Sequence, residues 1–240
     1  MISSPASNTP RAALVTGGSR GIGFAIAQAL TAAGAVVAIT GRDQNALDEA
    51  RRQLGGQTLA LGADVQNEQE AVRAVDEAAG RFGGLDVLVN NAGVGLFASV
   101  ADMTPAQWRQ VIETNLSGVF YCCHAAIPHL RRRGGGWIIS ISSLASKNAF
   151  PNGAAYCASK SGLNAFSETL MQEVRHDNIR VSCVMPGSVS TGFAARGEQG
   201  TADWKLTPQD VAQTVMDLIA HPARSLPSRV ELRPSRPPQK

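Results

Sequence analysis

Aromatic residues, charge and long apolar runs are all scarce in this sequence. Of its 240 residues, 5% are aromatic and 17% are charged, and the formal net charge is only +3. A charge this small excludes an extended nucleic-acid-binding surface, and a 44% hydrophobic content excludes intrinsic disorder. No apolar run approaches the roughly 18 residues that a membrane helix needs. We therefore expect a soluble protein that binds neither nucleic acid nor membranes.

Cysteine and histidine are also few, and neither follows a metal-binding spacing. The four cysteines include one adjacent pair but no Cys-x-x-Cys, and the four histidines are scattered. We expect no metal site, and we expect the cysteines to be reduced and buried, as in a cytoplasmic protein. The start of the chain is rich in Ser, Pro and Asn and lacks the apolar core of a secretory signal, which also predicts a cytoplasmic location.

Apolar, β-branched runs alternate with helical patterns along the whole chain. This alternation predicts a parallel sheet covered by helices on both faces, and continuous apolar runs such as 36–39 are typical of its strands. The predicted fold class is therefore α/β, a single Rossmann-type doubly wound parallel sheet of about seven strands. We expect strands at 12–16, 35–40, 58–62, 85–90, 137–142, 180–185 and 230–233, and helices at 20–33, 44–54, 66–82, 105–132, 153–176 and 208–220.

Several helix ends carry local signals. Asp43 is a candidate N-cap, and Thr104 and Thr207 are N-cap candidates that each precede a proline. The arginines at 131–133 are followed by three glycines. Cations and then glycine are typical of a helix C-terminus, so we interpret this run as a helix end rather than a binding surface.

Glycine, with 24 residues, exceeds its usual share of about 7%. One cluster, Thr16-Gly17-Gly18-Ser19-Arg20-Gly21-Ile22-Gly23, follows the first predicted strand and leads into a helix. Glycines allow this tight turn and let backbone N–H groups of the helix N-terminus approach a pyrophosphate. The spacing differs from Gly-x-Gly-x-x-Gly, and an ordinary glycine-rich connection is the alternative. Its place after the first strand favours dinucleotide binding.

The end of the second predicted strand favours NADP over NAD. An acid there would bind the free 2′-hydroxyl of the adenosine ribose, whereas an arginine would bind a 2′-phosphate. The strand ends in Gly41 and Arg42, and Arg20 lies in the glycine turn. Two guanidinium groups could hold a phosphate through charge-assisted hydrogen bonds. Asp43 is the competing signal, but its position is better explained by helix capping.

Further motifs follow in order: Asn90-Asn91-Ala92-Gly93, Asn115, Ser143, Tyr156-Cys157-Ala158-Ser159-Lys160 and Pro186-Gly187. With the glycine turn, they resemble the short, single-domain branch of the short-chain dehydrogenase/reductase family over about residues 12–193. Within that branch, the motifs resemble those of 3-oxoacyl-carrier-protein reductases and related ketoreductases. The resemblance implies an NADPH-dependent enzyme that interconverts a ketone or 3-oxoacyl carbonyl and a secondary alcohol, as a homodimer or homotetramer.

The resemblance also implies a role for each matching residue. Tyr156 would be the general acid/base, Ser143 would polarise the carbonyl, and Lys160 would tune Tyr156 and bind the nicotinamide ribose. Asn115 would hold a water in a proton relay to Lys160. The NADP cofactor would contact residues that follow the predicted strands, together with the catalytic pair: Gly17, Ser19, Arg20, Gly21, Ile22, Gly23, Arg42, Asp64, Val65, Asn91, Ala92, Tyr156, Lys160, Val189 and Thr191.

The spacing of the catalytic residues is consistent with this chemistry. Tyr156 and Lys160 are four apart, so a helix places them on one face. A nearby ammonium would lower the phenol pKa from its ordinary value of about 10. Ser143 follows the fifth predicted strand, where open α/β sheets bind ligands, although Ser140 and Ser142 are rivals. A plain helix kink is the alternative role for Asn115.

The domain organisation follows from these predictions. We expect a disordered N-terminus at 1–10, an NADP-binding catalytic domain at 11–233 and a proline-rich tail at 234–240. The substrate should be selected by the segment 188–206, which contains Phe193, Trp204, Arg196 and Lys205. A non-catalytic NADP-binding regulator on the same fold is the alternative function, because a fold does not establish activity. The complete catalytic set argues against it.

Overall fold

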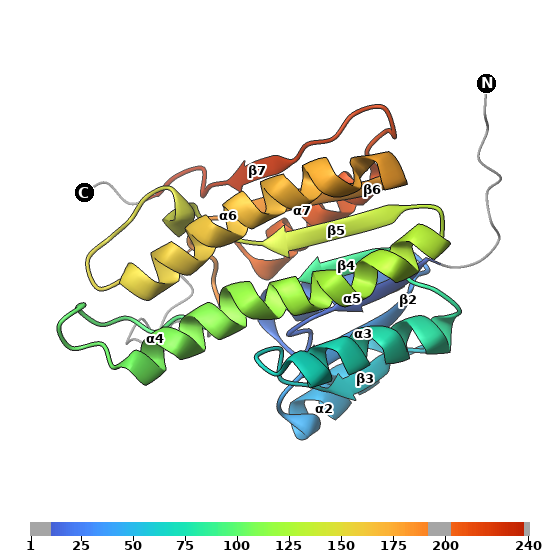
Figure 1. Cartoon of the computed structure of the whole chain (residues 1–240), viewed down its shortest axis with the longest axis horizontal. Helices are drawn as coiled ribbons and strands as arrows, with labels where there is room; N and C mark the ends of the chain where they lie inside the picture. Colours follow the sequence, from blue (N-terminus) through green and yellow to red (C-terminus); the bar gives the residue numbers. More distant parts are fainter. Residues whose placement is uncertain (1–10, 192–202, 238–240) are drawn as a thin grey trace.

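A seven-stranded sheet forms the centre of the computed structural model, which describes residues 11–191 and 203–237. The strand order is β3-β2-β1-β4-β5-β6-β7, and all six pairings are parallel (Figure 1). The α/β fold class is therefore confirmed. The strands are β1 (Ala12–Val15), β2 (Val36–Gly41), β3 (Leu59–Gly62), β4 (Val87–Asn90), β5 (Gly136–Ile141), β6 (Ile179–Pro186) and β7 (Arg229–Leu232).

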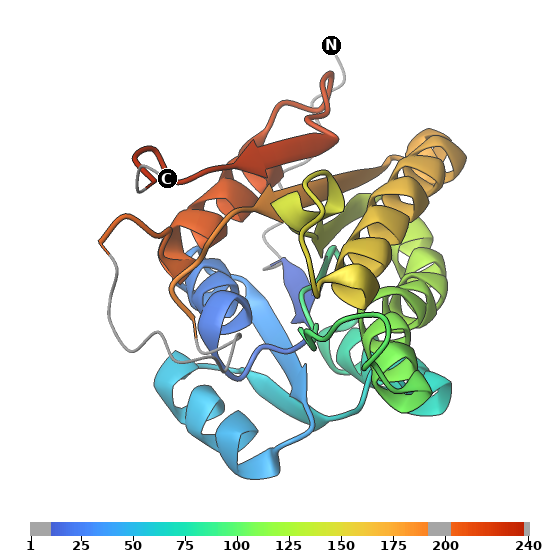
Figure 2. The same ribbon diagram turned by 90° about the vertical axis from the view of Figure 1, so that its left-hand side faces the viewer.

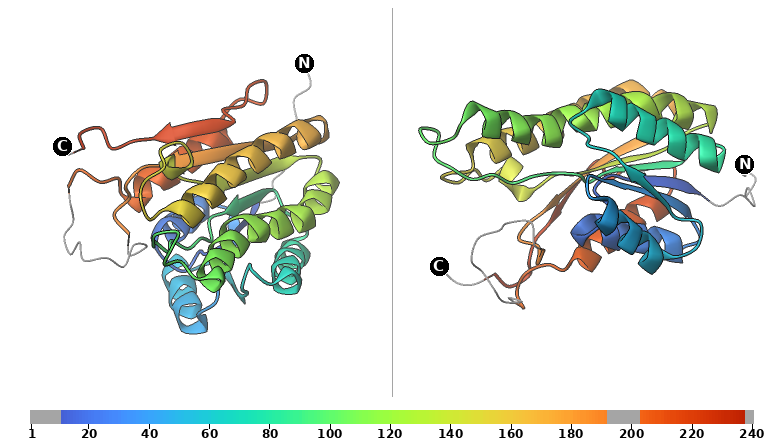
Figure 3. Two further views of the ribbon diagram at one scale, coloured as in Figure 1. Left: turned by 60° about the vertical axis from the view of Figure 1, so that its left-hand side comes forward. Right: turned by 90° about the horizontal axis from the view of Figure 1, so that it is seen from below.

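Helices cover both faces of the sheet (Figure 3, right). The helices α1 (Gly21–Ala32), α2 (Gln44–Leu54) and α7 (Pro208–Ala220) cover one face, and α3 (Glu68–Phe82), α5 (Gly118–Arg132) and α6 (Ala154–Val174) cover the other. Each face has its own apolar core because neighbouring strand residues point to opposite sides. Leu14 and Leu88 lie in the core beneath α3, α5 and α6, whereas Val15 and Val89 lie in the core beneath α1, α2 and α7.

The predicted helix caps are confirmed. Asp43 Oδ1 accepts a hydrogen bond of 3.1 Å from the backbone N of Ala46, and both Thr104 and Thr207 form capping boxes. The helix α5 ends at Arg132, as the arginine run predicted. Its flanking arginines form ion pairs, Arg131 with Asp177 and Arg133 with Asp86, so these two are engaged within the fold.

The predicted helix at 105–132 is wrong in one respect, because it is not continuous. It consists of α4 (Pro105–Ile112), one π-helical turn (Glu113–Ser117) and α5. The wider turn accommodates Asn115, whose fully buried amide hydrogen-bonds to both backbone polar groups of Val94. A π-helical turn inside an α-helix is frequently found at a functional site.

Some predictions fall on parts of the chain outside the described residues. These are the N-terminal segment 1–10, the end of the tail at 238–240, and Phe193 and Arg196. In the described parts of the chain, no helix is both long and apolar enough to cross a membrane. All four cysteines are free and buried, as predicted.

Candidate active site

The predicted site residues gather at the edge where the parallel strands end, which faces the viewer in Figure 2. From β1 the chain builds the sheet outward to β2 and β3, and it then returns to place β4 on the other side of β1. The strand order therefore reverses between β1 and β4, and such a point opens a crevice for ligands. The loops that follow these two strands are in contact, because a Cβ at Gly17 would lie 2.9 Å from the Cα of Ala92.

Hydrogen bonds join the glycine turn to the loop after β4. The hydroxyl of Thr16 accepts from the backbone N of Asn91 and of Ala92, each at 3.0 Å. The Asn91 amide donates to the carbonyl oxygens of Thr16 and Gly17 at 2.9 and 3.1 Å. Gly17 has a φ of +62°, which favours glycine, and a Cβ at Gly23 would lie 2.3 Å from the Gly17 oxygen. The turn is therefore rigid and closed to side chains.

The N-terminus of α1 differs from those of α2, α3, α4 and α7. Those four have capping side chains, whereas no side chain of the described residues caps α1 at Arg20. The first-turn N–H groups of α1 can therefore meet an anionic ligand. Thr191 lies beside this turn, with its Cγ2 3.6 Å from a Cβ built at Gly21. The glycine turn and the first turn of α1 (residues 17–23), which we call the glycine cradle, thus have the shape and donors that a pyrophosphate requires.

Two arginines lie near this cradle. Arg20 and Arg42 are both exposed, and the side chain of Ser19 lies beside the end of β2, 3.5 Å from a Cβ built at Gly41. Arg42 approaches Asp64 at 3.9 Å, which is a long contact for exposed groups and worth little energetically. Arg42 can therefore exchange this contact for a phosphate.

The other predicted cofactor residues lie along the same edge. Asp64, which follows β3, accepts a hydrogen bond from the backbone N of Gln66 at 3.0 Å. Val65 is buried, and its backbone lies against the start of α5. Ile22 is half-buried in the first turn of α1, and Val189 forms a parallel bridge with Leu206.

Ser143, Tyr156 and Lys160 meet where the C-terminal end of β5 lies beside the N-terminal part of α6. The side chains of Ser143 and Tyr156 are hydrogen-bonded to each other. The ammonium of Lys160 is buried 5.8 Å from the centroid of the Tyr156 ring and donates to the carbonyl oxygen of Ile141 at 2.8 Å. Burial lowers the pKa of Lys160 to about 8, and the charge interaction with Cys183 raises it.

The prediction that Lys160 lowers the pKa of Tyr156 is wrong for this structure. Burial raises the pKa of Tyr156, while the hydrogen bond with Ser143 lowers it and the neighbouring Cys157 raises it. The physical reason is burial, because a phenol removed from water holds its proton more tightly. Tyr156 therefore stays protonated at neutral pH.

The rival serines lie away from Tyr156 in the interior. Ser140 is buried within β5, and Ser142 is buried with its hydroxyl donating to the carbonyl oxygen of Lys160 at 3.3 Å. Ser143 is half-buried and is the N-cap of a 3-10 turn (Leu144–Ser146). Of these three serines, Ser143 has the described contact with the phenol.

Asn115 connects three segments around Lys160. Its Oδ1 accepts from the backbone N of Val94 at 2.8 Å, and its Nδ2 donates to the Val94 oxygen and to Ser159 Oγ, each at 3.0 Å. A Cβ at Gly93 would lie 3.2 Å from Asn115 Oδ1 and 3.7 Å from Lys160 Nζ. The side chain thus fixes the loop after β4 beside Lys160, and its role in a proton relay stays a prediction.

Phe97 and Phe150 are site residues that the sequence analysis missed. The Phe97 ring meets the Tyr156 ring edge-on with centroids 5.7 Å apart, and the centroid of the Phe150 ring lies 5.8 Å from that of Phe97. The loops that carry them are joined by a hydrogen bond from Ala98 N to Asn152 O. No motif marks these positions; only their position after β4 and before α6 could have suggested them.

The family model described as short chain dehydrogenase matches residues 11–201. The chain belongs to the short-chain dehydrogenase family. It is 30% identical over 232 residues to an uncharacterized oxidoreductase of Staphylococcus saprophyticus, covering 93% of this chain and 97% of that protein. As a member of this family, the chain is an oxidoreductase with a single Rossmann-type domain.

Two solved structures share the fold over nearly the whole chain. A metagenomic short-chain oxidoreductase in complex with NADP is 37% identical, with a TM-score of 0.83 and coverage of 95% of this chain and 98% of that one. An alcohol dehydrogenase from the archaeon Thermococcus sibiricus, complexed with 5-hydroxy-NADP, is 28% identical, with a TM-score of 0.85 and coverage of 96% and 99%.

Proposed function

We propose that this oxidoreductase is an NADPH-dependent reductase that converts a ketone-type carbonyl into a secondary alcohol, with residues 11–233 as its catalytic domain. One observation carries the proposal: the hydrogen-bonded side chains of Ser143 and Tyr156 lie beside Lys160, at the edge that carries the glycine cradle. An acid, a polarising hydroxyl and a cation are the groups that reduction of a carbonyl needs.

When bound, NADPH supplies the hydride that adds to the carbonyl carbon. Ser143 donates a hydrogen bond to the carbonyl oxygen and so stabilises the developing negative charge. Tyr156 then gives its proton to that oxygen, which completes the alcohol. Burial raises the pKa of Tyr156, so the phenol holds this proton at neutral pH. Lys160 would hold the nicotinamide ribose, and its charge would help to return a proton to Tyr156.

The glycine cradle fits NADPH and indicates which residues would hold it. Gly17, Gly21 and Gly23 leave room for the pyrophosphate beside the uncapped start of α1. Arg20 and Arg42 would bind the 2′-phosphate, and this cofactor is supported by NADP in one solved neighbour and 5-hydroxy-NADP in the other. The adenine would lie at Asp64 and Val65, and the nicotinamide at Asn91, Ala92, Val189 and Thr191.

The aromatic wall beside Tyr156 indicates the substrate. Phe97 contacts the phenol ring, Phe150 contacts Phe97, and Phe150 is 43% exposed, so the two rings form an apolar surface that begins at Tyr156. Such a wall favours a carbonyl with an apolar or aromatic neighbour over a strongly charged one.

We also infer a homo-oligomer, as a dimer or tetramer. Phe120 on α5 is 49% exposed, and its ring lies 6.4 Å from that of Phe166 on α6. An exposed aromatic ring beside a half-buried one on a neighbouring helix is typical of a protein interface. Light scattering should show more than one chain per particle, and Phe120→Glu should lower that number.

A panel of carbonyl compounds, assayed with NADPH and with NADH, tests the proposed function. We expect turnover with aryl or alkyl ketones and NADPH, and we expect Tyr156→Phe to abolish it while NADPH still binds. Tyr121→Phe is the matched control, because Tyr121 is the other tyrosine of the chain and lies on α5. NADPH binding without turnover by the natural chain would instead support a non-catalytic regulator, and turnover by Tyr156→Phe would refute the assigned acid.

A further inference from the structure

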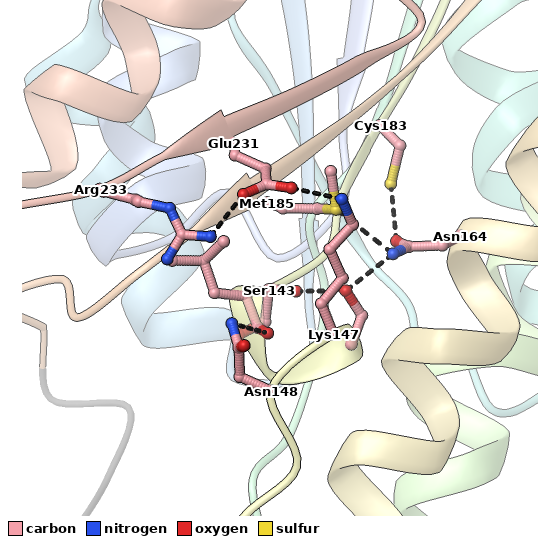
Figure 4. Close-up of polar contacts among 10 residues, drawn as sticks. Ser143, Lys147, Asn148, Asn164, Cys183, Met185, Glu231 and Arg233 are labelled. Carbon is pink, nitrogen blue, oxygen red and sulfur yellow. Dashed lines mark hydrogen bonds and ion pairs between the residues drawn. The ribbon is translucent and has the colours of Figure 1, made fainter.

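Asn164 lies one helical turn after Lys160 on α6, and its whole amide is engaged in the interior (Figure 4). The thiol of Cys183 donates to Asn164 Oδ1 at 3.1 Å. Asn164 Nδ2 donates to Ser146 Oγ at 2.7 Å and to the sulfur of Met185 at 3.3 Å. Only 9% of the residue is exposed, so these partners replace water. A buried amide with every group satisfied is held in one orientation.

The chemistry of its neighbours fixes which end of this amide faces the 3-10 turn. A thioether sulfur can only accept a hydrogen bond, so the NH₂ group must lie on the side of Met185. Ser146 lies on that same side, and its hydroxyl oxygen therefore accepts a hydrogen bond from Asn164. The opposite end faces a thiol, which can donate.

Ser146 connects Asn164 to Ser143 through hydrogen bonds. Its hydroxyl has one proton, which it donates to the carbonyl oxygen of Ser143 at 2.6 Å. The Ser146 backbone N also donates to that oxygen, at 3.1 Å. Ser161, on α6, donates to the carbonyl oxygen of Ser146 at 2.8 Å. The 3-10 turn is therefore fastened to α6 at Ser146, and hydrogen bonds in such a chain strengthen one another.

We propose that Asn164 is a positioning residue that acts through Ser146 to hold Ser143 against the hydroxyl of Tyr156. Tyr156, Lys160 and Asn164 lie on α6 at intervals of four residues, which keeps all three on one side of the helix. Fastening the turn to α6 therefore fixes Ser143 relative to Tyr156. The catalytic importance of this contact rests on the proposed function, whereas the contact itself does not.

The exposed side of the same turn has a second attachment that does not involve Asn164. Lys147 forms an ion pair with Glu231 on β7, and Glu231 also pairs with Arg233 (Figure 4). These groups are at the surface, where ion pairs contribute little. The buried link through Asn164 should therefore dominate the position of Ser143.

The Tyr156 pKa gives a test that does not depend on knowing the substrate. The hydrogen bond with Ser143 lowers this pKa, so displacing Ser143 should raise it. The chain has two tyrosines, and in a Tyr121→Phe background the ultraviolet absorbance of phenolate reports Tyr156 alone. Ser143→Ala gives the full upward shift of the titration midpoint. Asn164→Leu should shift the midpoint in the same direction, and adding it to Ser143→Ala should give no further shift.

The kinetic arm uses Asn164→Asp, which keeps an acceptor for Cys183 but removes the donor to Ser146. We expect kcat to fall by about 10- to 100-fold, as for other small misplacements of a reacting group, with little change in the KM for NADPH. Met185→Leu is the matched control, because it removes the weaker acceptor of Asn164 Nδ2 with little change in volume. It should leave both kcat and the midpoint close to those of the natural chain.

The midpoint of the Tyr156 titration decides whether Asn164 positions Ser143. If Asn164→Leu does not fold, Ser146→Ala breaks the same link at the half-buried turn and should give the same upward shift. An unshifted midpoint in the folded variants overturns the proposal, even where kcat falls, because a structural defect alone would leave the Ser143 contact intact. If the variants shift the midpoint but the natural chain turns over no carbonyl, the positioning role would be supported and the proposed function contradicted.

Discussion

The ammonium of Lys160 donates a hydrogen bond of 2.8 Å to the carbonyl oxygen of Ile141, the last residue of β5. This contact joins α6 to the C-terminal end of β5. Ser142 and Ser143 follow directly in the sequence. The contact also places a cation in the interior, where only 4% of the lysine is exposed. A buried charge is costly, and that cost appears in the lysine's titration.

The first prediction concerns stability as a function of pH. Burial lowers the pKa of Lys160 from 10.5 to about 8. Below pH 8 Lys160 carries its proton in both the folded and the unfolded chain, so the full cost of burying the ammonium lowers the stability of the folded chain. Between about 8 and 10.5 only the unfolded chain carries it, so this residue's contribution to stability rises with pH. Relative to Lys160→Met, the natural chain should gain about 3 kcal/mol over this window.

Urea unfolding at a series of pH values measures this difference. Comparing the two chains at each pH cancels the titration of the other groups. Lys147→Met is the matched control for replacing a lysine with methionine, because Lys147 is exposed. A flat difference for Lys160→Met would contradict the buried charge.

A second prediction separates backbone strain from collision at the glycine cradle. Gly17 and Gly34 both have positive φ, +62° and +85°, but only at Gly17 would a Cβ meet other atoms. Gly34→Ala should therefore cost about 1–2 kcal/mol of unfolding free energy. Gly17→Ala should cost about 1–3 kcal/mol more, because its methyl group meets the Ala92 backbone at 2.9 Å. It should also weaken NADPH binding, measured by fluorescence titration, whereas Gly34→Ala should not.

A third prediction concerns the π-helical turn. Asn115→Ala would leave the N–H and carbonyl groups of Val94 without their side-chain partner, and unfolding free energy should fall by about 3 kcal/mol. Hydrogen exchange at Val94 N–H should become faster. Asn148→Ala is the control, because this exposed amide makes one long bond of 3.3 Å to Leu144. Slow exchange at Val94 in the Asn115 variant would show that the amide is not its main protection.

Local patterns were sufficient to predict the fold and the glycine turn. Strand periodicity, capping residues and the glycine cluster all act within a few neighbouring residues, so a single sequence displays them. The caps at Asp43, Thr104 and Thr207 are of this kind. The same is true of the i, i+4 spacing that brings Tyr156 and Lys160 together.

Contacts between distant segments account for what could not be predicted. The break in the helix depends on Val94, which lies 21 residues from Asn115 in the sequence. The direction of the Tyr156 pKa depends on burial, which periodicity does not reveal. Asn164 carries no motif, and its importance appears only when Ser146 and Cys183 are brought to it from other elements.

The last prediction tests cofactor choice at Gly41, at the end of β2. A Cβ there would make ordinary contacts, 3.4 Å from Leu47 Cδ2 and 3.5 Å from Ser19 Oγ, so a side chain fits. In Gly41→Asp, the carboxylate would repel the 2′-phosphate of NADPH and accept a hydrogen bond from the 2′-hydroxyl of NADH. The ratio of kcat/KM for NADPH to that for NADH should fall by about 100-fold. Gly41→Asn has the same size without the charge and should change the ratio far less. An equal change in both variants would contradict recognition of a 2′-phosphate at this position.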